Sequence, residues 1–391
     1  MIICNPVDKC TGCGLCLNSC PKNAISFKKD KEGFLYPEIN PKLCVKCNKC
    51  INICPQNQKE PFATKSKRII YYYANAIERK TRNSGSSGGI FGVIAKNLLK
   101  SGYVIYGAAF DNNLHLSHMR AENEKELKRL YCSKYIQSDI SNIHKNVLQD
   151  IKNGTKVLFV GTPCQVDAIK RFVGDTQLMI TIDLVCYGVG SNSFFDDYLQ
   201  SQEQKYRAKA TDVIFRKKIY GNHDGFTTIK FKNSKKYKRI FYQTEFGIAF
   251  CNYLINRPSC YDCKYSSLNR TGDLTIGDYR PSSNKRINPF QLKKGVSLIK
   301  VNTTIGEELI NLLLETKKVK VTEVDYEKIK DKLVRYSPEI ISREKRDKAM
   351  EIYTENGYNV FVDNYCLMNK KTYFEMQISY LKEIVKWIIR K

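Results

Sequence analysis

The chain has 391 residues, of which 42% are hydrophobic and 27% are charged. This balance excludes an intrinsically disordered chain, a collagen-like repeat and a small disulfide scaffold, and the length suggests two or three domains. Lysine and arginine exceed aspartate and glutamate by 65 − 39 = 26 charges. Such a chain should attract something acidic: nucleic acid, an anionic membrane surface, an acidic redox partner or a phosphorylated cofactor.

The cysteine count indicates which chemistry to look for. No uncharged apolar run approaches the roughly 18 residues that a membrane span needs. The N-terminal segment also lacks the basic start and apolar stretch of a secretory signal. We therefore expect a soluble, cytoplasmic protein. Its sixteen cysteines then favour metal ligation over disulfides, because the cytosol keeps thiols reduced.

Two copies of one cysteine motif occupy the first sixty residues. Each copy reads C-x2-C-x2-C-x3-C-P, and the second lies 34 residues after the first. The doubled motif is typical of a bacterial two-cluster ferredoxin. Zinc ribbons use pairs of C-x2-C instead, and disulfides among cysteines this crowded would be strained.

The spacing also predicts how the thiolates divide between two [4Fe-4S] clusters. Three closely spaced thiolates can bind three irons of one cluster, whereas the fourth, before the chain-turning proline, reaches the other cluster. The expected ligand sets are Cys10, Cys13 and Cys16 with Cys54, and Cys44, Cys47 and Cys50 with Cys20. Because such clusters pass one electron at a time, this region should be an electron relay for the rest of the chain.

After a short linker at 61–67, strand and helix patterns alternate along the chain. Strands are expected at 68–77, 103–110, 156–160 and 178–185. Helices are expected at 90–100, at 139–152, up to 173 after the third strand, and from 192 onward. Alternation of this kind predicts βαβ units, and hence an α/β domain with a mainly parallel sheet.

The loop before the 90–100 helix is a weak candidate for a phosphate site. Ser87, Gly88 and Gly89 would lie at a helix N-terminus, whose free N–H groups favour an anion. The loop is not a G-x-G-x-x-G fingerprint, however, so a flexible loop explains it equally well. His115 and His118 have no nearby ligands in the sequence, and we expect both at the surface.

Four further cysteines could form a site in the body of the chain. Cys164 and Cys186 each follow the carboxyl end of a predicted strand, the edge at which open α/β sheets place their sites. Cys260 and Cys263 form a separate C-x2-C pair. Four thiols are the number that a third cluster or a structural zinc requires. Lone buried cysteines are also common in protein cores, so the spacing leaves these alternatives open.

Two segments could contact partners. Residues 205–239 contain twelve Lys or Arg against two acidic residues, and their alternation predicts an antiparallel meander with a basic face. That face is either solvated or a docking patch for an acidic partner, and its few aromatic residues argue against nucleic acid. The last segment, 372–391, predicts an amphipathic helix that packs on protein or lies on an anionic membrane.

Seven stretches of this sequence resemble the coenzyme F420 hydrogenase/dehydrogenase beta-subunit family, in members with an N-terminal two-cluster ferredoxin. Each stretch is weak alone, but their combination in family order is specific. They are SGSSGGIFGVIAKNLLKSGYVIYGAAF (84–110), SKYIQSD (133–139), KVLFVGTPCQVDAIK (156–170), TIDLVCYGV (181–189), VIFRKK (213–218), PSCYDCKYSSLNRTGDLTIGD (258–278) and KGVSLIKVNT (294–303).

The resemblance implies an α/β fold that binds FAD next to a third [4Fe-4S] cluster. The family's cluster ligands match Cys164, Cys186, Cys260 and Cys263. Its flavin site is built partly from a Ser-Gly-Gly loop and from the SKY and GTPCQ stretches, which match Ser87, Gly88, Gly89, Lys134, Gly161 and Thr162.

Two departures from the family pattern bear on the flavin or the substrate pocket. Tyr279-Arg280 follows the IGD triplet, where the family often has tryptophan, and Gly221-Asn222 replaces a frequent Gly-Trp. Ferredoxin-fused relatives also occur in bacteria that do not make the deazaflavin coenzyme, often beside genes for surface-polysaccharide synthesis. The resemblance therefore leaves the substrate open between a deazaflavin and a polysaccharide-pathway intermediate.

Together these observations predict an iron–sulfur flavoprotein oxidoreductase. Electrons would pass between ferredoxin-type clusters and FAD, which exchanges a hydride with an organic substrate. The alternative is a non-catalytic relay subunit that delivers electrons to a partner enzyme. An acidic redox partner, such as a ferredoxin or another oxidoreductase, would suit the basic charge. The expected domains are a two-cluster ferredoxin (1–60), an FAD and [4Fe-4S] domain (61–330) and a helical C-terminal extension (331–391).

Overall fold

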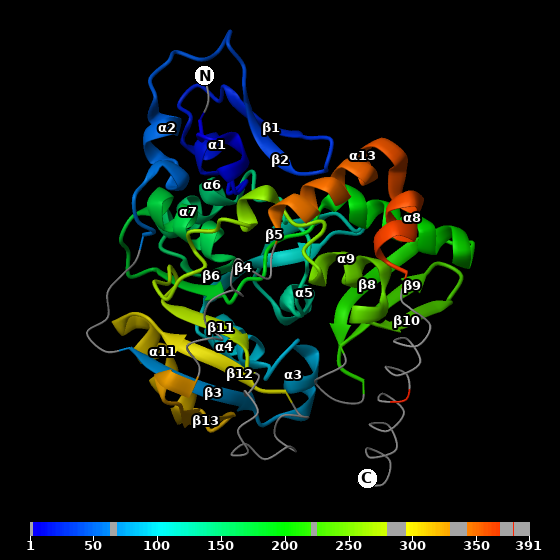
Figure 1. Ribbon diagram of the computed structural model, residues 1–391. Coiled ribbons are helices and arrows are strands. Elements are labelled where there is room, and N and C mark those ends of the chain that lie inside the picture. Colours follow the sequence, from blue (N-terminus) through cyan, green and yellow to red (C-terminus); the bar gives the residue numbers. More distant parts are fainter. Residues whose placement is uncertain are drawn as a thin grey trace.

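The computed structural model describes residues 3–62, 69–219, 225–279, 295–328, 342–367 and 378. A ferredoxin-like region at the N-terminus lies on top of a larger α/β body in Figure 1. Several predictions fall outside the described residues: most of the linker, Gly221, Asn222, Arg280 and all of the final helix except Ile378.

Two short α-helices, two 3-10 helices and a β-hairpin form the ferredoxin-like region. The elements are η1 (Val7–Lys9), α1 (Leu15–Ser19), β1 (Ile25–Lys29), β2 (Leu35–Ile39), α2 (Lys49–Ile53) and η2 (Pro55–Asn57), with β1 and β2 antiparallel. Cysteines supply most of the buried cluster in this region, beside Ile3 and Ile25. A region this small, with so few aliphatic side chains inside, has little apolar core of its own.

Eight strands form the sheet of the body. They are β3 (Ile70–Ala76), β4 (Tyr103–Phe110), β5 (Leu116–Ala121), β6 (Lys156–Gly161), β7 (Met179–Leu184), β11 (Leu274–Asp278), β12 (Ser297–Val301) and β13 (Val319–Glu323). Their order is β13-β3-β12-β11-β7-β6-β4-β5. The four central strands β11, β7, β6 and β4 are parallel, and the strands on either side are antiparallel. The predicted α/β class is confirmed, with the parallel pairs at the centre of a mixed sheet.

Helices cover both faces of this sheet. The helices α4 (Ile90–Lys100), α5 (Glu124–Leu130) and α11 (Thr304–Glu315) pack on one face. The helices α6 (Ile143–Lys152) and α7 (Pro163–Val173) pack on the other. Burial on both faces explains why the first five residues of the central strand β7 are all buried, including the polar Thr181 and Asp183. A short helix that the sequence did not predict, α3 (Arg79–Ser84), lies in the loop before α4.

A second, aromatic-rich core lies beside the sheet. Its elements are α8 (Asn192–Tyr206), β8 (Ala210–Lys217), β9 (Phe226–Phe231), β10 (Lys236–Ile240), η3 (Phe241–Gln243), α9 (Glu245–Cys251) and α13 (Arg343–Tyr365). The short helices η4 (Pro258–Cys260) and η5 (Tyr326–Lys328) lie elsewhere in the chain. The predicted antiparallel meander is confirmed as β8, β9 and β10. Its buried side includes Ile229 and Phe231, and Lys230 and Lys232 are exposed.

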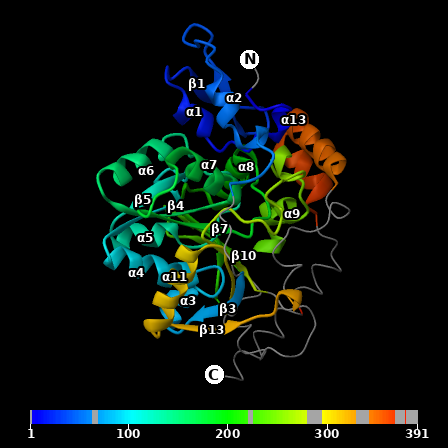
Figure 2. The same cartoon turned by 90° about the vertical axis from the view of Figure 1, so that its left-hand side faces the viewer.

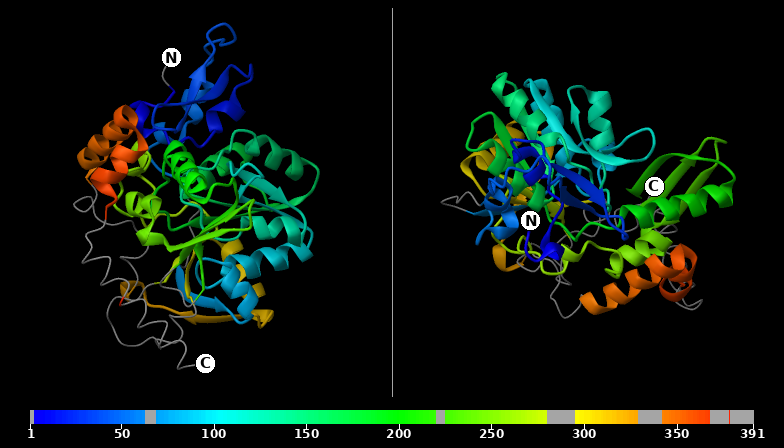
Figure 3. Two further views of the ribbon diagram at one scale, coloured as in Figure 1. Left: turned by 90° about the vertical axis from the view of Figure 1, so that its right-hand side faces the viewer. Right: turned by 90° about the horizontal axis from the view of Figure 1, so that it is seen from above.

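The views in Figures 2 and 3 show how these parts are arranged. The ferredoxin-like region sits over α6, α7 and α8, and α13 runs beside it. The meander projects from the side of the molecule, away from the N-terminal region. Within the described part of the chain, no helix combines the length and the apolar character needed to cross a membrane.

Candidate redox site

The two N-terminal motifs exchange their fourth cysteines. The thiols of Cys13 and Cys16 lie close enough to Cys10, and to Cys54 of the second motif, for their charges to interact. Burial raises the pKa of Cys13 to about 12 and raises the pKa of Cys16 well above its usual value. Buried thiols of this kind become thiolates when metal cations compensate the charge. The group therefore fits one [4Fe-4S] cluster.

The remaining cysteines of the two motifs line a small cavity near the surface: Cys20, Cys44, Cys47 and Cys50. Cys50 is buried and Cys47 is exposed, so this set extends from the core of the region to its surface. Both predicted N-terminal sets are thus brought together. Cys4, which belongs to neither motif, is buried in the same apolar cluster as Cys54, and only the tertiary structure reveals that position.

A third group of cysteines lines a cavity at the carboxyl edge of the parallel strands: Cys164, Cys186, Cys260 and Cys263. Cys164 lies in the first turn of α7, directly after β6, and Cys186 follows β7. Cys260 ends η4, and Cys263 lies three residues further along. The fold therefore gathers the four cysteines that the resemblance implied.

The donor set of this cavity suits a cluster. A [4Fe-4S] cluster binds one thiolate at each of its four irons, so its ligands surround a volume and do not converge on a point. Among the described residues, no three His, Cys, Asp or Glu side chains converge closely enough to hold a single metal ion. Four thiols around one cavity match the chemistry that a cluster requires.

The start of α7 is fixed by its own sequence. Thr162 and Gln165 form a capping box, in which the Thr162 N–H donates to Gln165 Oε1 over 3.0 Å. Pro163 occupies the first helical turn, where its missing N–H costs nothing. The Thr162 hydroxyl lies 3.1 Å from Cys164 Sγ. The loop after β6 therefore holds Cys164 in a defined position.

The ferredoxin-like region closes over this third cavity. Thr11, which lies between the first two cysteines of the first motif, is one of its lining residues. The fully buried Arg257 connects the two parts. Its guanidinium donates to the Cys10 carbonyl over 2.7 Å, to the Leu35 carbonyl over 3.0 Å and to Gln137 Oε1 over 2.6 Å. The first cysteine motif is thereby held against the wall of the body's cysteine cavity.

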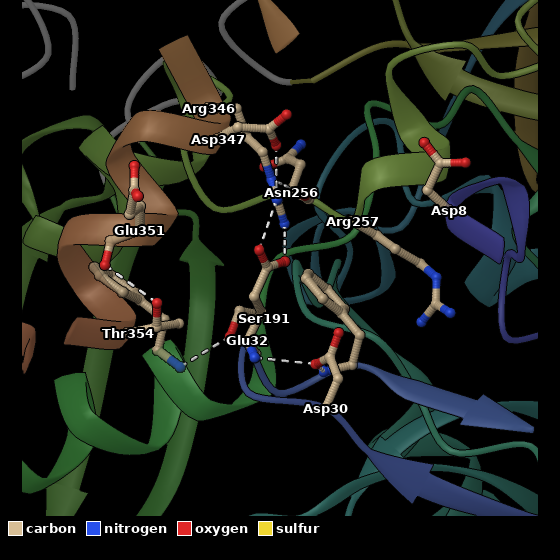
Figure 4. A network of polar contacts seen from close by, with 12 residues as sticks. Asp8, Asp30, Glu32, Ser191, Asn256, Arg257, Arg346, Asp347, Glu351 and Thr354 are labelled. Atoms are coloured by element: carbon tan, nitrogen blue, oxygen red, sulfur yellow. Dashed lines mark hydrogen bonds and ion pairs between the residues drawn. The ribbon is translucent and has the colours of Figure 1, made fainter. Parts of the chain in front are cut away.

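A second set of polar contacts ties the ferredoxin-like hairpin to α13. Figure 4 shows Arg346 of this helix facing the Glu32 carboxylate. Arg346 Nη1 lies 2.9 Å from Glu32 Oε1, and Arg346 Nε donates to the Asn256 carbonyl over 3.0 Å. The side chain of Arg346 is only 2% exposed. Charge-assisted bonds to a buried guanidinium are strong, so this contact fixes the hairpin on the body.

A large cavity lies on the other side of the body's cysteines. It holds about 1460 Å³, including the part that is open to solvent. Ser87, Gly89, Lys134, Gly161 and Thr162, five of the six residues expected at a flavin, line it. Apolar side chains form much of the remaining wall, among them Ile90, Phe91, Leu130, Ile136, Val160 and Ile276. A mostly apolar cavity with a few polar groups is typical of a cofactor site.

The sixth expected residue, Gly88, lies behind this wall. Its N–H donates to Ser297 Oγ over 2.9 Å. A Cβ atom at this position would lie 2.3 Å from the Ala74 carbonyl oxygen, which is closer than a side chain can approach. Gly88 therefore lets the loop before α4 pack tightly on β3 and β12, and it is a packing residue.

The two cavities of the body share a wall. Cys186 lines both of them, as do Thr162, Gln165, Val185, Gly188 and Val189. Residues directly after β6 and β7 supply this shared wall, because the two strands are parallel neighbours and end at the same edge of the sheet. A group held by the four cysteines would lie next to a group bound in the large cavity.

Charged side chains at the large cavity include some that the motifs did not single out. Arg216 Nη1 lies 2.6 Å from Asp278 Oδ2 and also contacts the Tyr135 hydroxyl at 3.2 Å. Lys134 donates to the carbonyls of Arg129 and Tyr131, and burial lowers its pKa to about 8. Arg216 and Asp278 lie in two of the stretches that resemble the family, which is the only sequence signal that could have found them.

His118 also lines this cavity, which corrects the surface position expected from the sequence. It is 5% exposed, and its ring nitrogens lie 2.9 Å from Ser138 Oγ and 3.1 Å from the Val160 carbonyl. His115 is exposed, as expected. Tyr279, one of the departures from the family pattern, packs on Tyr73 with a ring-centroid distance of 5.5 Å.

Two family models match parts of this sequence. Residues 154–327 match the family described as the C terminus of the coenzyme F420 hydrogenase/dehydrogenase beta subunit. Residues 9–58 match the 4Fe-4S dicluster domain. The body of the chain is therefore similar to the coenzyme F420 hydrogenase/dehydrogenase beta subunit, and its N-terminal region is similar to 4Fe-4S dicluster domains. Proteins with a 4Fe-4S dicluster domain carry iron–sulfur clusters, so this chain is an iron–sulfur electron-transfer protein related to that beta subunit.

The sequence was also compared with solved structures and with curated proteins. One solved structure, from the F420-reducing [NiFe] hydrogenase complex of Methanosarcina barkeri, matches at 16% sequence identity with a TM-score of 0.46. The match covers 77% of this chain and 97% of that chain. No curated protein matches the sequence.

Proposed function

We propose that this protein is a flavin-dependent oxidoreductase, with FAD in the large cavity and a third [4Fe-4S] cluster on the body's four cysteines. The observation that carries the proposal is the shared wall of the two cavities, to which Cys186 contributes. When bound, the clusters carry single electrons, and FAD exchanges these for a hydride with an organic substrate. That substrate would be a polysaccharide-pathway intermediate or a deazaflavin.

The order of the cysteine sets supports an electron path through the molecule. The outer set reaches the surface at the exposed Cys47, whereas the other N-terminal set has no exposed member and contains the buried Cys16 and Cys54. Cys13 in turn lies close enough to Cys164 for the charges of the two thiolates to interact. The four body cysteines then adjoin the large cavity. Each step joins neighbouring sites, which is what successive one-electron transfers need.

The residues of the large cavity have distinct proposed tasks. Its apolar walls would exclude water from the reacting atoms. Ser87 and Gly89 at the N-terminus of α4, together with Lys134, would hold the phosphates of FAD. The buried Arg216–Asp278 pair would keep a guanidinium at the wall, where it favours an anionic group of the cofactor or substrate.

Anaerobic purification with a count of iron, sulfide and flavin tests the proposal. We expect about 12 Fe and one FAD per chain, because three [4Fe-4S] clusters contain 12 irons. Cys164→Ser and Cys263→Ser should each lower the count by about four irons. Cys251→Ser, which changes a half-buried cysteine of α9, is the matched control and should keep the full count.

Other outcomes would contradict the proposal. A count of about 8 Fe, unchanged in Cys164→Ser, would remove the third cluster. Clusters without any flavin would favour the alternative, a relay subunit that passes electrons to a partner enzyme. Flavin that stays bound and supports turnover with an artificial dye would favour catalysis in this chain.

A further inference from the structure

The 34-residue repeat makes one cysteine motif an internal control for the other. Gly12 and Gly14 of the first motif have left-handed backbones, with φ of 65° and 75°. They also lie against the body. A Cβ atom at Gly12 would be 2.2 Å from Gln137 Nε2, and one at Gly14 would be 3.2 Å from Ile140 Cγ2. The left-handed backbone favours glycine at both positions, and the close approach of the body leaves no room for a side chain at Gly12.

The equivalent positions in the second motif are Lys46 and Asn48. Their φ values of 55° and 58° repeat the left-handed conformation, so the loop follows the same path around its cysteines. Both side chains are exposed. Residues other than glycine adopt this left-handed conformation rarely. At Lys46 it places a lysine side chain at the surface beside a cluster site. The surface that docks on the body in the first motif therefore faces solvent in the second.

That surface has a distinct composition. We call it the second-motif face, made of Lys22, Lys42, Leu43, Val45, Lys46 and Lys49. Leu43 and Val45 are 50% and 57% exposed, and residues 39–54 contain no acidic residue. Lys22, Val45 and Lys49 also line the cavity of the outer cysteine set. A basic surface with two exposed apolar side chains thus surrounds the site nearest to solvent.

We propose that the second-motif face is the docking site of a small acidic electron-carrier protein. The inference rests on the proposed electron path and names the surface at which that path meets its partner. Lysines around a solvent-near redox site attract an acidic partner from a distance and orient it, and the apolar pair provides contact once the proteins meet. Such transient redox interfaces are small. One electron leaves the carrier and enters the outer cluster, and no bond is made or broken.

The basic meander is the rival surface. Lys232, Lys235 and Lys236 at the β9–β10 turn are exposed as well. Their strands cover an aromatic core that includes Phe231 and Tyr237. The meander also projects from the side of the molecule, away from the ferredoxin-like region (Figure 3). In the described part of the meander, the charged side chains lie over this aromatic core and not over a cysteine set, so the meander is the matched control.

Stopped-flow reduction of the anaerobically purified full chain tests the proposal, with a reduced plant-type [2Fe-2S] ferredoxin as the acidic donor. The double charge reversal Lys42→Glu with Lys46→Glu should slow cluster reduction about tenfold at low ionic strength. Lys232→Glu with Lys236→Glu should change the rate by less than about twofold. With reduced methyl viologen, a small cationic donor, the rate should not fall in either variant.

Several outcomes decide the question. Each variant's iron count is measured first, and if the glutamates lower it, Lys42→Gln with Lys46→Gln replaces them, with an expected slowing of about threefold. A second-motif variant that keeps its iron and its reduction rate overturns the proposal, as does a larger effect of the meander variant. Cluster reduction requires neither flavin nor substrate. A chain without flavin that still shows the slowing would refute the proposed oxidoreductase and support the docking site.

Discussion

His118 shows how a single buried residue couples this fold to pH. Burial lowers its pKa to about 4, below the value of about 6.5 that it has when unfolded. Protonation therefore favours the unfolded chain, and stability is complete above pH 6.5 and is lost as the pH falls toward 4. From pH 7 to pH 5 this residue should cost about 2 kcal/mol in the free energy of unfolding. Denaturant unfolding of the wild type and of His118→Gln at both pH values measures the difference.

His115→Gln is the control for this prediction, because His115 lies three residues away and is exposed. The pH dependence of that variant should follow the wild type, whereas His118→Gln should have a flatter dependence. Equal slopes for the wild type and His118→Gln would contradict the buried, neutral state of His118.

Residues at the candidate site differ in how well the sequence predicts them. The cysteines of both N-terminal motifs are predictable, because a cluster requires ligands at fixed spacing along the chain. The contacts of Arg216 and Arg257 are not predictable, because they depend on Asp278 and Gln137, which lie 62 and 120 residues away along the chain. His118 was assigned to the surface for the same reason: its sequence neighbours give no sign of the Ser138 hydroxyl that faces it.

At the scale of elements, α13 should stabilise the ferredoxin-like hairpin through one ion pair. Arg346→Met would leave the Glu32 carboxylate, whose side chain is 16% exposed, without its main partner. We expect a loss of about 3–5 kcal/mol in the free energy of unfolding, as for other buried pairs that lose one member. The double variant with Glu32→Gln should lose less than the sum of the single variants. Denaturant unfolding under anaerobic conditions measures all three.

The same helix, α13, contains an exposed arginine that serves as the control for Arg346→Met. Arg343 also reaches the ferredoxin-like region, with its Nη1 3.2 Å from Asp8 Oδ2, but its side chain is 41% exposed. Arg343→Met should therefore cost no more than about 1 kcal/mol. Similar losses for Arg343→Met and Arg346→Met would show that burial of the pair is unimportant.

Elements with a clear apolar period were predictable. The expected bounds of α4 and β4 coincide with those observed. Both elements have apolar residues at regular spacing, and these residues are buried in the same core. The helix α3 was expected as a loop, since its sequence RKTRNS has no apolar period and owes its helix to neighbouring contacts. Strand pairing was also not predictable from the sequence. An apolar strand such as β3 does not indicate whether the neighbouring strands run parallel or antiparallel to it.

At the scale of the molecule, the ferredoxin-like region, the body and α13 are joined at a few buried arginines. Arg346 binds Glu32 from one side, and Arg257 binds the Cys10 and Leu35 carbonyls from the other. Both arginines are fully buried, and each spans segments more than 200 residues apart. The cavity of the body's cysteines is covered only while the first motif stays in place. The integrity of that site should therefore depend on contacts made outside it.

Arg257→Lys tests this dependence, because lysine keeps the charge but cannot donate in three fixed directions. The variant should bind as much iron as the wild type when purified without oxygen. In the presence of an iron chelator, however, it should lose iron about tenfold faster, because weaker contacts let the ferredoxin-like region open more often. The absorbance of the iron–chelator complex over time gives the rate, and Arg343→Lys serves as the exposed control. If both variants lose iron as slowly as the wild type, Arg257 does not hold the region closed over the cysteine cavity.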